Sequence, residues 1–143
     1  MNSRINHVAV WILVVVHEAL AFCWYKIFGN VWLNYHARTM TDIENTHDVK
    51  AYLFAIVAAI VANYTLAWLI ARMQATNAVA GSKIALICWF AFVFLQHATI
   101  AVFSAFETNP WPLVLIDMGW LFLAFAISGV VLGGWRQNNS TTA

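Results

Sequence analysis

Residues 113–135 read LVLIDMGWLFLAFAISGVVLGGW and contain one charged side chain, Asp117. A helix of this length, at about 1.5 Å per residue, crosses a hydrocarbon core about 30 Å thick. Three more runs of this kind lie at residues 8–28, 51–71 and 84–106. In lipid such segments satisfy their backbone polar groups as helices. The sequence therefore predicts an all-α, polytopic membrane protein: a four-transmembrane-helix bundle that forms a single domain over residues 1–143.

The composition supports a lipid-facing surface and excludes one class of partner. The chain is 63% hydrophobic and 9% charged, with a formal net charge of +1. Soluble domains carry about 25% charged residues, so this chain has too few to cover a water-facing surface. It also has no basic patch that would neutralise phosphates, which argues against nucleic acid. The expected partner is the lipid bilayer.

Turn-forming residues divide the four runs. Gly29-Asn30 is typical of turns, as are Asn77 and Gly81-Ser82 in the second connection, and prolines at 110 and 112 prevent a helix from continuing. These breaks predict an outer loop over residues 29–50 and a polar C-terminal tail over residues 136–143. Within the loop, Thr41 and Glu44 have the spacing of a capping box, which predicts a short interfacial helix.

The basic residues predict the orientation of the bundle. Four of them fall on one side of a four-span topology, and no acidic residue joins them there; they are Arg4, Arg72, Lys83 and Arg136. Basic residues concentrate in cytoplasmic loops, so both termini are expected to be cytoplasmic. The eight Trp fall near the two ends of the spans, as in the aromatic belts of membrane interfaces.

Several segments resemble a known family. Residues 22–32, FCWYKIFGNVW, resemble the WY, FG and W signature of the DUF1761 family, and residues 63–67, 115–119 and 129–135 are similar to its later helices. The resemblance covers most of the chain. It implies a bacterial integral membrane protein of undetermined activity, and hence a multi-pass protein of the bacterial inner membrane. His17-Glu18 and Lys26-Ile27 depart from the family pattern, so a function built on them would be particular to this chain.

Polar side chains inside the spans are the candidates for function. Ionisable groups there cost about 2.5–3.5 kcal/mol on insertion scales and mark functional sites by default. All candidates fall at or beyond the bilayer centre, toward the predicted non-cytoplasmic side. They are His17, Glu18, Lys26, Asn63, Gln96, His97 and Asp117.

Three interpretations of these residues remain open. Interhelical hydrogen bonding explains them without any further activity. A proton or ion relay through Glu18, His97 and Asp117 fits the rarity of buried carboxylates. His17 and His97 are the candidate ligands for a metal or a haem, but no pair has the HExxH spacing and no Cys accompanies them. The sequence therefore predicts no metal site and implies no particular cofactor.

Small residues in the fourth span predict close helix packing. Gly129 and Gly133 form a GxxxG pattern, which serves contacts within a bundle or between copies. The functional expectation is a small homo-oligomeric transporter or channel-like protein that handles a proton or a small polar solute. The alternative is a non-transporting protein that binds a lipophilic or other small ligand, or assists another membrane complex. An enzyme is not expected, because no nucleophile–base pair is evident.

Overall fold

The computed structural model describes residues 5–36, 39–42, 49–104 and 109–135. Its long helices form four rods. The first is α1 (His7–Tyr35), the second is α3 (Val49–Arg72), and the fourth is α6 (Trp111–Gly134). The third rod, Ala78–Phe103, consists of α4 (Ala78–Cys88), η1 (Trp89–Phe94) and α5 (Leu95–Phe103). Each rod is long and apolar enough to cross a membrane, which confirms the predicted fold class.

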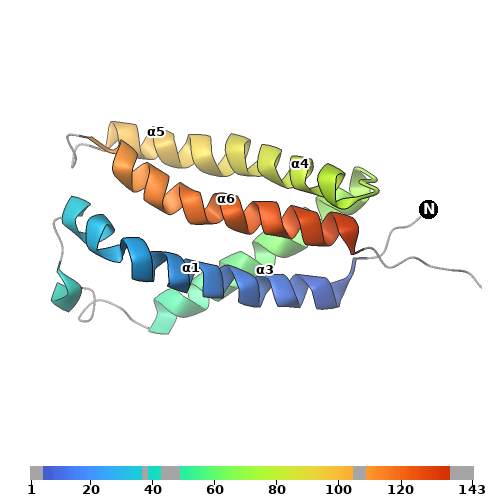
Figure 1. Cartoon of the computed structure of the whole chain (residues 1–143), viewed down its shortest axis with the longest axis horizontal. Helices are drawn as coiled ribbons and strands as arrows, with labels where there is room; N and C mark the ends of the chain where they lie inside the picture. Colours follow the sequence, from blue (N-terminus) through green and yellow to red (C-terminus); the bar gives the residue numbers. More distant parts are fainter. Residues whose placement is uncertain (1–4, 37–38, 43–48, 105–108, 136–143) are drawn as a thin grey trace, which may run out of the picture.

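Helix α6 is the centre of the bundle, because it packs against α1, α3 and the α4–α5 rod. Figure 1 shows that the start of α1, the end of α6 and the α3–α4 connection lie together at one end. We call this the terminal end, and the opposite one, with the α5–α6 connection, the distal end. At the terminal end, the Asn6 side chain joins the start of α1 to the end of α6, since its Nδ2 donates to the Trp135 carbonyl at 3.3 Å.

Three glycines let α4 and α6 approach closely. A Cβ added to Gly129 would lie 2.5 Å from the Cα of Ser82, and one added to Gly133 would lie 2.6 Å from the Asn77 carbonyl. A Cβ on Gly81 would collide with the Gly129 carbonyl. The predicted packing role of Gly129 and Gly133 therefore appears inside the chain, at the α4–α6 contact.

The predicted turn at Gly81-Ser82 is wrong. Helix α4 begins three residues earlier, at Ala78, where Asn77 caps it by accepting the Ala80 N–H at 2.9 Å. Gly81 allows close helix packing here. Glycine suits turns and close helix contacts alike because it lacks a side chain, so the sequence alone does not distinguish the two.

The predicted break at Gly29-Asn30 is also wrong, so the outer loop is shorter than residues 29–50. Helix α1 continues without interruption to Tyr35. A Cβ on Gly29 would meet nothing within 4 Å, and the residue has no positive φ that would require glycine. The additional turns carry Trp32 on a rigid helix, where it bonds to Asp117 of α6.

The loop contains a short helical stretch at residues 40–42, capped two residues earlier than predicted. The Thr39 hydroxyl and backbone N–H both donate to the Asp42 carboxylate at 2.7 Å, and the Asp42 N–H returns to Thr39 Oγ1 at 3.3 Å. This reciprocal pattern is a capping box. Glu44, which the sequence assigned to the box, lies outside the described residues.

A buried hydrogen bond connects α3 and α6. Asn63 and Ser128 are both fully buried; the Ser128 hydroxyl donates to Asn63 Oδ1 at 2.8 Å, and Asn63 Nδ2 donates to the Ala59 carbonyl at 2.9 Å. Every polar atom of this pair that faces the apolar core is thereby satisfied, as buried groups require.

We predict that Ser128→Ala lowers the free energy of unfolding by about 1 kcal/mol, because it leaves Asn63 Oδ1 without its donor. The measurement is a double-mutant cycle with Asn63→Ala, read as reversible unfolding in mixed micelles. A coupling energy near zero would contradict the account of this contact.

Candidate functional site

Asp117, in the distal half of α6, accepts two hydrogen bonds from α1. The Tyr25 hydroxyl donates to Oδ1 at 2.7 Å, and the Trp32 indole N–H donates to the same oxygen at 2.9 Å. Tyr25 and Trp32 are seven residues apart, which places them on one face of the helix two turns from each other. The first and last spans therefore meet at a carboxylate inside the predicted membrane region.

The other oxygen of Asp117 faces a histidine from the third rod. His97 Nε2 lies 3.6 Å from Oδ2, too far for a hydrogen bond but within ion-pair distance when the imidazole is protonated. The side chains of His97 and Asp117 are 36% and 19% exposed, so both are partly accessible. Three of the four spans thus contribute to a polar cluster of Asp117, His97, Tyr25 and Trp32, which we call the Asp117 cluster.

Trp24 fixes the register of α1 against α6 next to this cluster. Its indole N–H donates to the Ile116 carbonyl at 2.9 Å. Gly119 makes the space for the ring, because a Cβ there would lie 2.7 Å from it. The hydrogen bond and the glycine together position the following residue, Tyr25, opposite Asp117.

Aromatic contacts extend the cluster toward the distal end. Tyr25 and Trp32 meet edge to face, with ring centroids 5.9 Å apart. His36, at the C-cap of α1, stacks on Trp32 at 4.0 Å. The Trp32 ring is therefore held by a stacked imidazole, by Tyr25 and by its bond to the carboxylate.

The structure places the other predicted site residues apart from Asp117. His17 is buried one layer nearer the terminal end, in contact with Trp120 and Phe125. Its Nε2 has no hydrogen-bond partner among the described residues. Glu18 is half-buried and lies seven residues before Tyr25, about 10 Å along the α1 axis.

The remaining candidates point elsewhere. Lys26 is exposed, with its Nζ 5.1 Å from the centre of the Phe22 ring. Gln96 is exposed although it neighbours His97. Asn63 belongs to the separate contact with Ser128. Of the seven predicted residues, the structure brings His97 and Asp117 together.

The described residues contain no group of three or more His, Cys, Asp and Glu side chains arranged to hold a metal ion. His17 and His97, the two candidate ligands, contact different layers of α6: His17 lies against Trp120 and Phe125, and His97 lies against Asp117. The structure thus gives these two imidazoles different environments.

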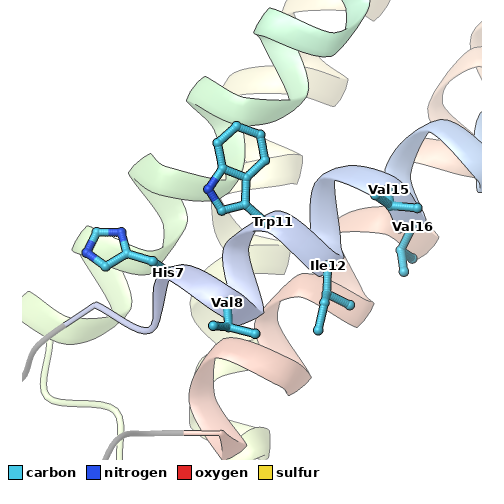
Figure 2. A pocket seen from close by; sticks show the side chains of 6 residues that line it. All are labelled: His7, Val8, Trp11, Ile12, Val15 and Val16. Atoms are coloured by element: carbon cyan, nitrogen blue, oxygen red, sulfur yellow. The ribbon is translucent and has the colours of Figure 1, made fainter.

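A separate, open depression lies on the surface of α1 in the terminal half (Figure 2). Its lining residues are His7, Val8, Trp11, Ile12, Val15 and Val16. Its polar atoms belong to the His7 imidazole and the Trp11 indole, and His7 Nδ1 lies 3.1 Å from the Tyr64 hydroxyl. The apolar lining suits lipid chains and offers no charged group to a polar solute.

The sequence predicts Trp24 and Trp32 as interfacial belt residues and predicts no role for Tyr25. The seven-residue spacing of Tyr25 and Trp32 was the available signal, since it aligns two donors on one helix face. That signal needed α1 to continue past Gly29, which the sequence did not predict.

Fold and site together define a small multi-pass membrane protein in which aromatic donors of the first span hold an acid of the fourth. The family model described as DUF1761, protein of unknown function, matches residues 8–133, and the chain belongs to this family. Neither a curated protein nor a solved structure shows significant similarity to it. Two segments that carried the resemblance, residues 22–32 and 115–119, meet at the Asp117 cluster.

Proposed function

We propose that this protein is a small proton-handling transporter of the bacterial inner membrane, with Asp117 and His97 as its proton-binding pair. The carrying observation is the 3.6 Å approach of the His97 imidazole to the Asp117 carboxylate inside the spans. Ionisable pairs at this depth are rare and typical of proton pathways. With both termini cytoplasmic, as the basic residues favour, the distal end faces outward.

The hydrogen bonds at Asp117 support a role for the second oxygen. Tyr25 and Trp32 both donate to Oδ1 and stabilise the ionised carboxylate. Oδ2 faces His97 Nε2, and an imidazole nitrogen can carry a proton or act as an acceptor. We therefore expect the exchangeable proton to bind at Asp117 Oδ2 or at His97 Nε2, which face each other.

Close helix packing in the terminal half supports access from the distal end. Gly81, Gly129 and Gly133 bring the α4 and α6 backbones together there. The buried bond between Asn63 and Ser128 joins α3 to α6. We propose Glu18 as the next proton acceptor inward, reached through water, because it lies on the Tyr25 face of α1 two turns nearer the terminal end.

A homo-oligomer is part of this proposal. Three of the four spans build the Asp117 cluster, and residues 49–58, the distal part of the remaining span α3, are exposed. A second copy that packs against this segment would complete the enclosure of a pathway. Mass measurement of the protein in native membrane nanodiscs tests this point, and a monomeric mass would reject it.

A second candidate function is an accessory or ligand-binding protein that transports nothing. Two observations favour it: both hydrogen bonds at Asp117 Oδ1 come from α1, and α4 packs closely on α6. Both are also expected of side chains that only hold the helices together. Under this alternative the Asp117 cluster acts through the packing of α1 on α6.

Proton flux into liposomes separates the two functions. We predict that the reconstituted protein, under an imposed membrane potential, acidifies liposomes loaded with a pH-sensitive dye. Asp117→Asn is expected to abolish the flux while retaining the fold, and His97→Ala to slow it strongly. Gln96→Leu is the matched control, because Gln96 adjoins His97 in sequence but is exposed. Wild-type flux no greater than that of protein-free liposomes would reject the proposal.

A further inference from the structure

The third rod is not a continuous α-helix. Its middle segment, η1 (Trp89–Phe94), is π-helical, and the Leu95 N–H bonds to the Phe90 carbonyl five residues back. A π turn takes up more residues than an α turn, and such turns occur mostly as single insertions within α-helices, frequently at functional sites. The surplus residue changes which side chains of α5 face α6.

Ala85 marks the side of α4 that faces α6. It is fully buried, and its Cβ lies 2.8 Å from the position of a Cβ on Gly129. Gln96 follows it by 96 − 85 = 11 residues, which is about three turns of an uninterrupted α-helix. An uninterrupted helix would therefore turn Gln96 toward α6 and place His97 about 100° away from that side.

The structure shows the opposite arrangement. Gln96 is exposed, whereas His97 lies 3.6 Å from Asp117 and the next residue, Ala98, is buried among α6 side chains. Residues 92, 96, 99 and 103 are exposed, and residues 93, 97, 101 and 104 are partly buried. The side facing α6 is thus displaced by one residue after η1, as a single inserted residue requires.

We propose that η1 is a one-residue insertion that selects His97, in place of Gln96, as the partner of Asp117. Contacts between Trp89 and Phe94 at 5.3 Å, and between Phe90 and Phe94 at 5.7 Å, stabilise the segment. Asp117 consequently faces an imidazole, whose ring nitrogens can carry or give up a proton, and not an amide, which cannot. This consequence for proton handling rests on the proposed function; the geometry of the insertion does not.

Crosslinking tests the register without any transport assay. In a background with Cys23→Ala and Cys88→Ala, cysteine is placed at 117 and at either 96 or 97. A short bifunctional thiol reagent is added to membranes, and mass spectrometry measures the crosslinked fraction. The 97–117 pair is expected to crosslink, and the 96–117 pair to fail.

Chain-length variants test the insertion itself. Deletion of Ala91, which is exposed in the middle of η1, removes the surplus residue. His97 then follows Ala85 by eleven residues, about three turns of a regular α-helix, so it still faces α6 and the 97–117 crosslink is expected to persist. An alanine inserted after Ala91 adds a second surplus residue and moves every later side chain one position along the helix. Gln96, in the original numbering, then takes the place of His97, so the 96–117 crosslink is expected to replace the 97–117 crosslink. Deletion of the exposed Leu123 from the uninterrupted helix α6 is the control, and it should destroy the crosslink.

Efficient 96–117 crosslinking in the full-length chain, or equal responses to the deletion and the insertion, would overturn the inference. The two cysteine pairs in the full-length chain decide the register even if the length variants do not assemble. A protein without proton flux that shows the expected crosslinks would reject the proposed function and leave this inference standing.

Discussion

Gly129→Leu is expected to prevent assembly of the bundle, with a loss of several kcal/mol in the free energy of unfolding. A Cβ at Gly129 would lie 2.5 Å from Ser82 Cα and 2.7 Å from the Gly81 carbonyl. Both are backbone atoms, so α4 and α6 must separate to relieve the overlap. Overpacking typically costs about 1–3 kcal/mol, and more where the backbone cannot shift. The measurement is the yield of monodisperse protein in detergent and its melting temperature.

Gly29→Ala is the matched control for this prediction. Gly29 also lies within a helix, but a Cβ there would meet nothing within 4 Å. The substitution should leave stability unchanged or raise it by up to about 1 kcal/mol, because alanine favours the helix. Equal stability of Gly129→Leu and Gly29→Ala would contradict the close packing of α4 on α6.

Asp117→Ala is expected to lower the free energy of unfolding by about 2–4 kcal/mol, because it leaves two donors unsatisfied at roughly 1–3 kcal/mol each. Those donors are the Tyr25 hydroxyl and the Trp32 indole N–H, which share one carboxylate oxygen. Asp117→Asn retains an acceptor and should lose much less. Reversible unfolding in mixed micelles measures both variants.

Removing one donor at a time shows how much each hydrogen bond to Asp117 contributes to the free energy of unfolding. Tyr25→Phe and Trp32→Phe each delete one hydrogen bond and leave the carboxylate with the other, so each should cost about 1 kcal/mol. An Asp117→Ala variant as stable as wild type would show that α1 and α6 hold together without the carboxylate.

Hydropathy alone predicted the four spans, because apolar runs of this length have few alternatives to membrane helices. The glycines could not be interpreted in this way. Gly29 and Gly81 were predicted to break helices, yet both lie inside them. The difference at Gly81 comes from α6, a segment distant in sequence, whose backbone needs the space that a side chain would fill.

The candidate site was predictable in part, since the rarity of acids in spans singles out Asp117. Its donors were not, because Tyr25 and Trp32 resemble ordinary interfacial residues until α1 is known to continue past Gly29. The sequence also does not predict whether Gln96 or His97 faces Asp117. The choice depends on a π segment of six apolar residues, WFAFVF, whose composition does not distinguish it from α-helix.

The most direct test of the central claim, that Asp117 is an exchangeable proton site paired with His97, is infrared difference spectroscopy of the protein in membranes during a pH change. We predict a carboxylic-acid band that appears as the pH falls, that is absent from Asp117→Asn, and whose frequency and midpoint change in His97→Ala. The Gln96→Leu variant should give the wild-type spectrum. A difference spectrum that is identical in wild type and Asp117→Asn would contradict the claim.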